Sequence, residues 1–284
     1  MSHAVLGIVD THPNLGKDEK MSPAQSESVE EPLVFASKGC PGSSDEGILR
    51  ITLNRPQQFN ALSSALLAAL EAELVRAGED PEVRVVVLAG AGRAFCAGHD
   101  LREMRAHEDE TWLRHLFDQC GSLMQRIGTL PQPVIARVHS IATAAGCQLV
   151  AACDLAVAST EARFATSGVN LGLFCSTPAV PLVANVGPKA AAEMLFTGEF
   201  ISAEQAARIG LVNSVTAPEA LDASVDALAR RIAKQSRHAL ASGKRLLAQL
   251  RQRAGFATAE AYALAAENMA RDMMSCDARA GIDA

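Results

Sequence analysis

The sequence predicts an α/β fold in which a core of strands and helices is followed by a helical C-terminal region. Apolar runs typical of buried strands occur at residues 48–53, 83–89 and 133–138. The segments between these runs have helical periodicity, and after residue 178 nearly every segment does. A chain of 284 residues that is 49% hydrophobic and 20% charged suits one sizeable globular domain with an appendage.

Local signals predict the elements of the first half. The strand at residues 48–53 stops at Asn54-Arg55-Pro56, because proline lacks the N–H that a strand ladder needs. A helix is expected from Ser63 or Ser64 to residue 78, since serine caps helices and leucines then recur at helical spacing. The other elements expected here are strands at residues 83–89, 133–138, 155–158 and 163–165, a helix at residues 111–127, and a helix ending near residue 153.

The second half is predicted to be almost entirely helical. Helices are expected at residues 178–185, 188–196, 203–209, 217–234, 238–251 and 258–274. The chain is therefore divided into an acidic arm (1–32), a core (33–200) and a helical region for capping or assembly (201–284). We expect the arm to be disordered, because it is polar and contains prolines but no apolar core.

Composition argues against several classes of function. The formal net charge of −6 disfavours a nucleic-acid partner, and no apolar run is long enough to span a membrane. Seven cysteines lie scattered without a CxxC pair, which favours reduced thiols over disulfides and gives no reason to expect a metal site. These features, with an arm too acidic for a presequence, favour a cytoplasmic location; the mitochondrial matrix is the alternative.

Two turns rich in small residues are the strongest candidates for a functional site. The turns at residues 95–101 and 143–148 each follow an apolar strand, and each is expected to open a helix. Backbone N–H groups at a helix start have no intrahelical partner, and glycine and alanine let a ligand approach them closely. If the two turns face one point, they form an oxyanion hole, in which fixed N–H donors stabilise charge on a carbonyl oxygen.

Two side chains of the first turn require separate interpretation. His99 follows Gly98 directly, so its backbone N–H is a candidate donor; its side chain is either functional or structural. Asp100 is most simply the cap of the following helix.

Motifs along the whole chain outside the arm resemble the enoyl-CoA hydratase/isomerase family, also called the crotonase family. The matching segments, in order, are Asn54-Arg55-Pro56, Asn60-Ala61-Leu62, residues 94–101, 131–136 and 146–149, Cys153-Asp154, Phe164, and residues 196–198, 202–206 and 210–212. In this order, the set of segments is highly specific for the family.

This resemblance implies a crotonase (ClpP-like) spiral of ββα units with a helical C-terminal trimerisation region. It implies a homotrimer or hexamer and an acyl-CoA ligand, with no cofactor beyond the coenzyme A thioester itself. The thioester oxygen is expected between the backbone N–H groups of His99 and Ala145. Other positions implied to line the substrate site are Ala61, Ala97, Gly98, Asp100, Leu101, Ala144, Gly146, Asn170 and Cys175.

The chain departs from the family at both catalytic glutamates. Aligning the motifs places Gln148 and Gly168 at those two positions. An amide cannot exchange a proton near neutral pH and glycine has no side chain, whereas each acid or base group is worth roughly 100–10,000-fold in rate. We therefore expect poor hydration by the family mechanism.

Three interpretations remain open. The first is a divergent hydratase or isomerase with a relocated acid or base, for which Asp100, His99 and Cys175 are candidates. The second is a decarboxylase acting on a methylmalonyl-CoA-like thioester, because loss of CO2 makes the enolate without a protein base. The third is a non-catalytic acyl-CoA binder.

The C-terminal end departs from the family as well. Family chains continue past a Gly-Ile-x-Ala segment into a short helix, whereas this sequence stops at residues 281–284. The helical region is therefore expected to be truncated.

Overall fold

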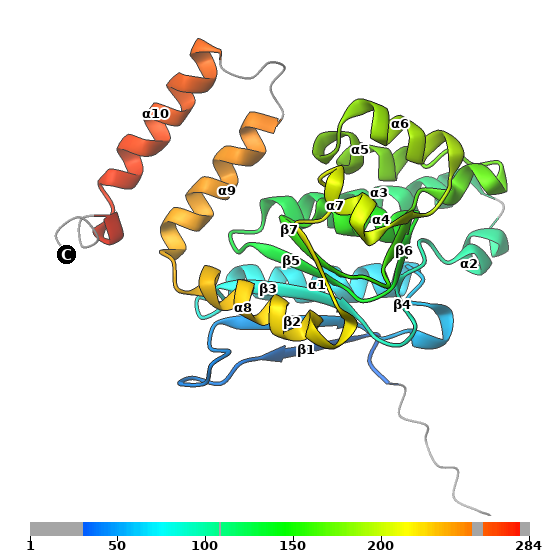
Figure 1. Ribbon diagram of the computed structural model, residues 1–284, viewed down its shortest axis with the longest axis horizontal. Helices are drawn as coiled ribbons and strands as arrows, with labels where there is room; N and C mark the ends of the chain where they lie inside the picture. Colours follow the sequence, from blue (N-terminus) through cyan, green and yellow to red (C-terminus); the bar gives the residue numbers. More distant parts are fainter. Residues whose placement is uncertain (1–30, 108, 252–257, 279–284) are drawn as a thin grey trace, which may run out of the picture. The chain divides into compact units, whose positions relative to one another are not determined.

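A six-stranded sheet lies at the centre of the computed structural model, which describes residues 31–107, 109–251 and 258–278 (Figure 1). Its strand order is β1-β2-β3-β5-β7-β10, with β1 antiparallel to β2 and every other neighbour parallel. These strands are β1 (Val34–Lys38), β2 (Ile48–Leu53), β3 (Val85–Gly90), β5 (Val134–Val138), β7 (Leu155–Ser159) and β10 (Ser214–Thr216).

A second, four-stranded sheet has the order β4-β6-β8-β9. Its strands are β4 (Ala94–Cys96), β6 (Ile141–Thr143), β8 (Arg163–Ala165) and β9 (Ile201–Ser202). The chain enters the large sheet at β3, β5 and β7 and each time continues into the small sheet at β4, β6 and β8, before a helix follows. This repetition is the expected spiral of ββα units.

Helices cover both faces of the large sheet. The helices of the described chain are α1 (Ser64–Glu79), α2 (Leu101–Ala106), α3 (Glu110–Thr129), α4 (Ala145–Ala152), α5 (Ser176–Asn185), α6 (Pro188–Thr197), α7 (Ala203–Arg208), α8 (Leu221–Ala233), α9 (Arg237–Arg251) and α10 (Ala259–Met273), and α1, α3 and α8 are among those that pack on the sheet. Because successive strand residues point to opposite faces, Val85 and Val87 pack with α8 while Val86 and Leu88 join the cluster with α1 and α3. A strand buried on both faces reads as a continuous apolar run, as β3 does.

The long predicted elements are confirmed, and Ser63 caps α1 by accepting a hydrogen bond from the Leu66 N–H at 3.2 Å. The prediction missed the short strands β1, β4, β6, β9 and β10, so the expectation of an almost wholly helical second half is wrong at residues 201–202 and 214–216. Three-residue strands form only because a partner strand is already in place, and no local pattern shows that partner. The helix predicted from residue 217 begins at Leu221, because a 3-10 turn at Pro218–Ala220 precedes it. Two further 3-10 turns lie at Pro56–Gln58 and Ser167–Leu171.

A buried lysine fastens α9 to the core. The Nζ of Lys244 donates to the carbonyl oxygens of Ile127 at 2.8 Å and Gln132 at 2.9 Å, and pairs with the Asp154 carboxylate at 2.6 Å. Asp154 also accepts the N–H of Val134 at 2.8 Å, at the start of β5. This network joins α9 to the end of α3 and to the start of β5, an interior strand of the large sheet.

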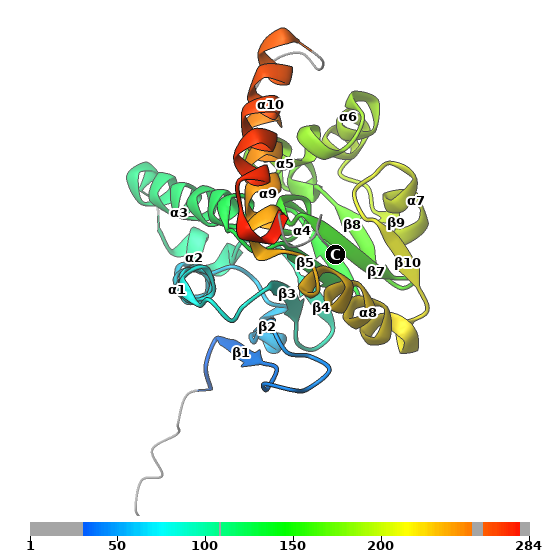
Figure 2. The same cartoon turned by 90° about the vertical axis from the view of Figure 1, so that its left-hand side faces the viewer.

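The helices α9 and α10 lie side by side in Figure 1, and α10 lies in front of α9 in the view of Figure 2. Ser242 Oγ donates to Asn268 Oδ1 at 3.0 Å, and His238 Nε2 lies 3.1 Å from Asp272 Oδ1. Tyr262, on α10, is 68% exposed, so an aromatic ring faces solvent there.

Residues 1–30, to which the prediction of a disordered arm applies, and residues 279–284 lie outside the described part of the chain. None of the described helices combines the length and the hydropathy needed to cross a bilayer. Every cysteine is a free thiol; Cys96, Cys120, Cys147, Cys153 and Cys175 are buried. The division at residue 200 stays a prediction.

Candidate functional site

The first predicted turn is held in place by the segment before α1. The N–H of Ala97 donates to the Phe59 carbonyl at 3.0 Å, the N–H of Leu62 donates to the Gly98 carbonyl at 2.7 Å, and the N–H of Asp100 donates to the Leu62 carbonyl at 3.1 Å. Gly98 has a φ of +95°, a conformation that residues with a side chain rarely adopt. The N–H of His99, which lies between these bonds, donates to no group in residues 31–107, 109–251 or 258–278.

Asp100 has the predicted capping role. Its carboxylate accepts the N–H groups of Arg102 at 3.1 Å and Glu103 at 3.3 Å, at the start of α2. It also pairs with the Arg55 guanidinium at 3.0 Å. Burial opposes ionisation, but the hydrogen bonds from Arg55 and the two N–H groups outweigh it and lower the pKa of Asp100. This carboxylate is ionised and engaged, which argues against a role as a relocated base.

The second predicted turn contains a strained residue. Ala144, just after β6, has φ 50° and ψ −119°, and its N–H donates to the Ala165 carbonyl at 2.9 Å. Such a backbone costs about 1–3 kcal/mol and persists only where the surroundings enforce it. The enforcing contact is close packing of α4 on β4: a Cβ added to Gly146 would lie 2.0 Å from the Cys96 carbonyl oxygen.

The two turns meet. A Cβ built on Gly98 would lie 2.9 Å from the Cβ of Ala144 and 3.3 Å from the backbone nitrogen of Ala145. Ala145 is the first residue of α4, and within the described chain its N–H donates to no other group. Two backbone donors without partners, from His99 and Ala145, are therefore brought together at one place in the fold.

The side chain of His99 lies beside α3. Its ring packs edge to face on Phe117, with 5.4 Å between the ring centroids. Both ring nitrogens are buried, and a hydrogen bond with the Leu62 backbone acts on the ring. Burial lowers the pKa of His99, so the imidazole is neutral at pH 7. Phe117 was not a sequence candidate, because its place on α3 is that of an ordinary packing residue.

The positions of the two missing glutamates differ in their surroundings. Gln148, in the first turn of α4, is 3% exposed, and its Oε1 lies 4.0 Å from the thiol of Cys120. At Gly168 the backbone N–H donates to Cys175 Sγ at 3.2 Å. A Cβ at residue 168 would lie 2.5 Å from the Leu173 carbonyl oxygen and 2.8 Å from that sulfur, so the loop has closed over the space a side chain needs.

The other predicted substrate-site residues have varied surroundings. The Ala61 carbonyl accepts a hydrogen bond from Arg55 at 2.6 Å, and Leu101 is 52% exposed at the start of α2. Asn170 donates to the Gly198 carbonyl at 3.3 Å, which directs its amide toward the end of α6. Burial raises the pKa of Cys175, so its thiol is protonated at neutral pH.

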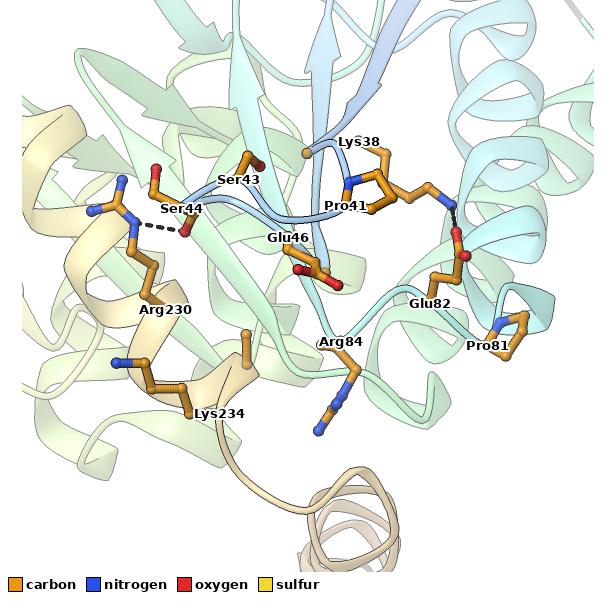
Figure 3. Close-up of a pocket in the computed structure, with 13 residues that line it drawn as sticks. Lys38, Pro41, Ser43, Ser44, Glu46, Pro81, Glu82, Arg84, Arg230 and Lys234 are labelled. Carbon is orange, nitrogen blue, oxygen red and sulfur yellow. Dashed lines mark hydrogen bonds and ion pairs between the residues drawn. The ribbon is translucent and has the colours of Figure 1, made fainter.

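A cavity of about 670 Å³ lies elsewhere, between the β1–β2 loop, the α1–β3 loop and the end of α8 (Figure 3). Two of its charged groups pair with each other, Lys38 with Glu82 at 2.6 Å, and Arg230 donates to the Ser44 carbonyl at 3.0 Å. None of the candidate residues lines it. Among the described residues there is also no cluster of three or more potential metal ligands.

A family model and several known proteins match this chain. The model of the enoyl-CoA hydratase/isomerase family matches residues 43–284. Enoyl-CoA hydratase domain-containing protein 3, mitochondrial, from Xenopus laevis is 44% identical over 238 residues, which are 84% of this chain and 80% of the relative.

Two solved structures show the same architecture. An enoyl-CoA hydratase from Mycobacterium smegmatis is 52% identical, with a TM-score of 0.84 over 89% of this chain and 95% of its own. Human enoyl coenzyme A hydratase domain-containing protein 3 is 37% identical, with a TM-score of 0.83 over 88% and 96%. The chain therefore has the crotonase fold and belongs to the enoyl-CoA hydratase/isomerase family.

Proposed function

We propose that this protein binds an acyl-CoA thioester and stabilises the enolate form of its acyl group. The observation that carries the proposal is the contact between the two turns, which brings the unpartnered N–H groups of His99 and Ala145 together. Two donors fixed in this way match a thioester oxygen on which negative charge develops. The relatives named as enoyl-CoA hydratases support the ligand class.

Hydration of an enoyl thioester is the reaction least favoured by the site. Addition of water needs a base to take a proton from water and an acid to protonate the enolate carbon. Gln148 and Gly168 provide neither group, and the Asp100 carboxylate is held by Arg55 and the start of α2. The site therefore has oxyanion donors but no acid or base for the proton transfers of hydration.

The test is to measure binding and hydration of crotonyl-CoA by the purified chain, beside a hydratase that has both glutamates. We expect binding, with turnover at least about 100-fold below the control, because each lost acid or base is worth roughly 100–10,000-fold. Turnover within tenfold of the control would refute the argument from the glutamates. Failure of any acyl-CoA to bind would refute the proposed site.

Decarboxylation is the second candidate, and it is favoured because the side chains that contact Gln148 and Gly168 are the neutral thiols of Cys120 and Cys175. In a malonyl-type thioester the bond from the 2-carbon to the carboxylate breaks, CO2 leaves, and the electron pair passes into the enolate. A proton from water then completes the product, so no protein base is needed. Release of CO2 from methylmalonyl-CoA or malonyl-CoA tests this candidate; no release, with binding intact, leaves a non-catalytic acyl-CoA binder.

We also propose that the chain acts as a homotrimer or hexamer without a cofactor other than its coenzyme A ligand. Exposed apolar side chains on and after α10, including Tyr262, Met269 and Met274, support self-association. For location we retain the cytoplasm, with the mitochondrial matrix as the alternative that the names of several relatives favour. Light scattering tests the assembly, and cell fractionation tests the location.

A further inference from the structure

A cavity of about 330 Å³ lies beside Gln148, the position of the first missing glutamate. One face each of α3, α4 and α5 bounds it, and Arg251, the last residue of α9, also lines it. Most of its lining side chains are small or apolar, among them Met124 of α3, Ala151 of α4 and Val180 of α5. Such a lining suits an alkyl chain, with the few polar groups deciding which chain is preferred.

The cavity adjoins the helix that carries one of the two oxyanion donors. Gln148 and Ala152, which line it, follow Ala145 by three and seven residues, so all three residues lie on one face of α4. At a rise of 1.5 Å per residue, Gln148 is about 4.5 Å along the helix axis from Ala145. An acyl chain whose thioester oxygen is bound at the Ala145 N–H therefore reaches this cavity within about one helical turn.

Arg251 carries the one ionised side chain among the described residues that line the cavity. Lys244, seven residues earlier, lies on the same face of α9 and is fastened to the core, so this face is directed inward. Burial lowers the pKa of Lys244, and the positive charge of Arg251 acts in the same direction. The nearby Asp154 is already paired with Lys244 at 2.6 Å, and Arg251 forms no ion pair within residues 31–107, 109–251 and 258–278. A positive charge without a counter-ion therefore lies at one wall of an apolar cavity.

An anionic group at the far end of an acyl chain would supply this counter-ion. A carboxylate matches a guanidinium with two parallel hydrogen bonds, whereas a methyl group at the chain end offers it nothing. On the basis of the proposed thioester binding, we infer that the acyl chain occupies this cavity and that Arg251 pairs with a carboxylate at its far end. The ligand class is then an acyl-CoA whose chain ends in a second carboxylate.

The test compares dissociation constants, by titration calorimetry, for ligands of equal chain length with and without the terminal carboxylate. The pairs are hexanoyl-CoA with adipyl-CoA, octanoyl-CoA with suberyl-CoA, and decanoyl-CoA with sebacyl-CoA. The wild-type chain should prefer the dicarboxylic member of at least one pair about five- to tenfold, the effect of a charge-assisted bond to an exposed arginine. Because salt screens an exposed charge, this preference should shrink in about 1 M sodium chloride.

Arg251→Gln should abolish the preference by weakening only the dicarboxylic ligand, and Arg251→Lys, which keeps the charge, should retain part of it. Arg245→Gln is the matched control, because Arg245 is an exposed arginine of the same helix that does not line the cavity. It should keep the wild-type preference.

A second pair of variants tests whether the chain occupies the cavity. Gly121 lines the cavity on α3, and a Cβ there would meet nothing within 4 Å, so Gly121→Leu fills space that is now open. It should weaken octanoyl-CoA about tenfold and leave acetyl-CoA unchanged. Gly128→Leu, on the same helix, is the control, because a Cβ there also meets nothing within 4 Å and Gly128 lies outside the cavity.

A preference that is absent from every pair in the wild type, or unchanged in Arg251→Gln, would overturn the inference. So would equal weakening of both members of a pair by Arg251→Gln, which would place this arginine at the coenzyme A phosphates. Unchanged binding of octanoyl-CoA to Gly121→Leu would overturn the assignment of the cavity to the acyl chain. If no acyl-CoA binds the wild-type chain, the proposed function fails first, whereas binding without a carboxylate preference removes this inference alone.

Discussion

Replacing Gly98 by alanine tests the convergence of the two turns. The new Cβ would lie 2.9 Å from the Ala144 Cβ, 3.1 Å from the Thr143 carbonyl oxygen and 3.3 Å from the Ala145 nitrogen. Contacts this short force the turns apart and displace the Ala145 donor. The residue also carries a φ of +95°, which costs about 1–3 kcal/mol for a residue with a side chain.

The loss expected at the site follows from the two hydrogen bonds to the thioester oxygen. At about 0.5–1.5 kcal/mol each, they are worth about 1–3 kcal/mol together, or about 5- to 150-fold in Kd. Any reaction through the enolate should lose more, about 100–1000-fold for one displaced donor. Calorimetric titration with butyryl-CoA, together with a melting curve, measures the first effect.

Gly172→Ala is the control, because it separates backbone strain from the contact between the turns. Gly172 also has a positive φ, +76°, but a Cβ there would meet nothing within 4 Å. Both variants should lose some stability, whereas only Gly98→Ala should lose affinity. Equal affinity for butyryl-CoA in the two variants would refute the oxyanion-hole geometry.

Three further predictions concern stability. Lys244→Met should lower the free energy of urea unfolding by about 3 kcal/mol, because it breaks the buried ion pair with Asp154. A decrease below about 1 kcal/mol would contradict a stabilising role for this ion pair. Burial lowers the pKa of His99 and His139, so on acidification the unfolded chain takes up protons before the folded chain does. The free energy of unfolding should therefore fall as the pH drops below about 6.5, the ordinary pKa of histidine, and a free energy that does not change with pH below this value would exclude the effect. Gly168→Ala should cost about 1–3 kcal/mol through its backbone clash, whereas Gly243→Ala, in open space on α9, should be neutral or stabilising; chemical unfolding of the pair distinguishes them.

Elements that bury a continuous apolar face could be predicted from the sequence. The strands β2 and β3 pair in parallel over six residues, and the leucines of α1 are fully buried, so their patterns carry enough signal. The three residues of β6 form a strand only because β4 and β8 lie on either side. The edge strand β1 exposes four of its five residues and so shows no apolar alternation.

The two turns of the site could be predicted from the sequence, but the contact between them could not. Small residues and a following helix marked both segments, and the capping role of Asp100 is confirmed. The positive φ of Ala144, the closed loop at Gly168 and the burial of the His99 ring against Phe117 depend on which segments meet in the folded chain. Spacing along a sequence does not contain that information.

The central claim, that His99 and Ala145 polarise a thioester carbonyl, is tested most directly by isotope-edited infrared spectroscopy. Crotonyl-CoA labelled with 13C at the carbonyl would be measured free, bound to the wild-type chain, and bound to Gly98→Ala. We predict that the carbonyl stretch moves to lower frequency on binding to the wild type and stays near its free value in the variant. Bound thioester with an unshifted stretch in the wild-type protein would contradict the account.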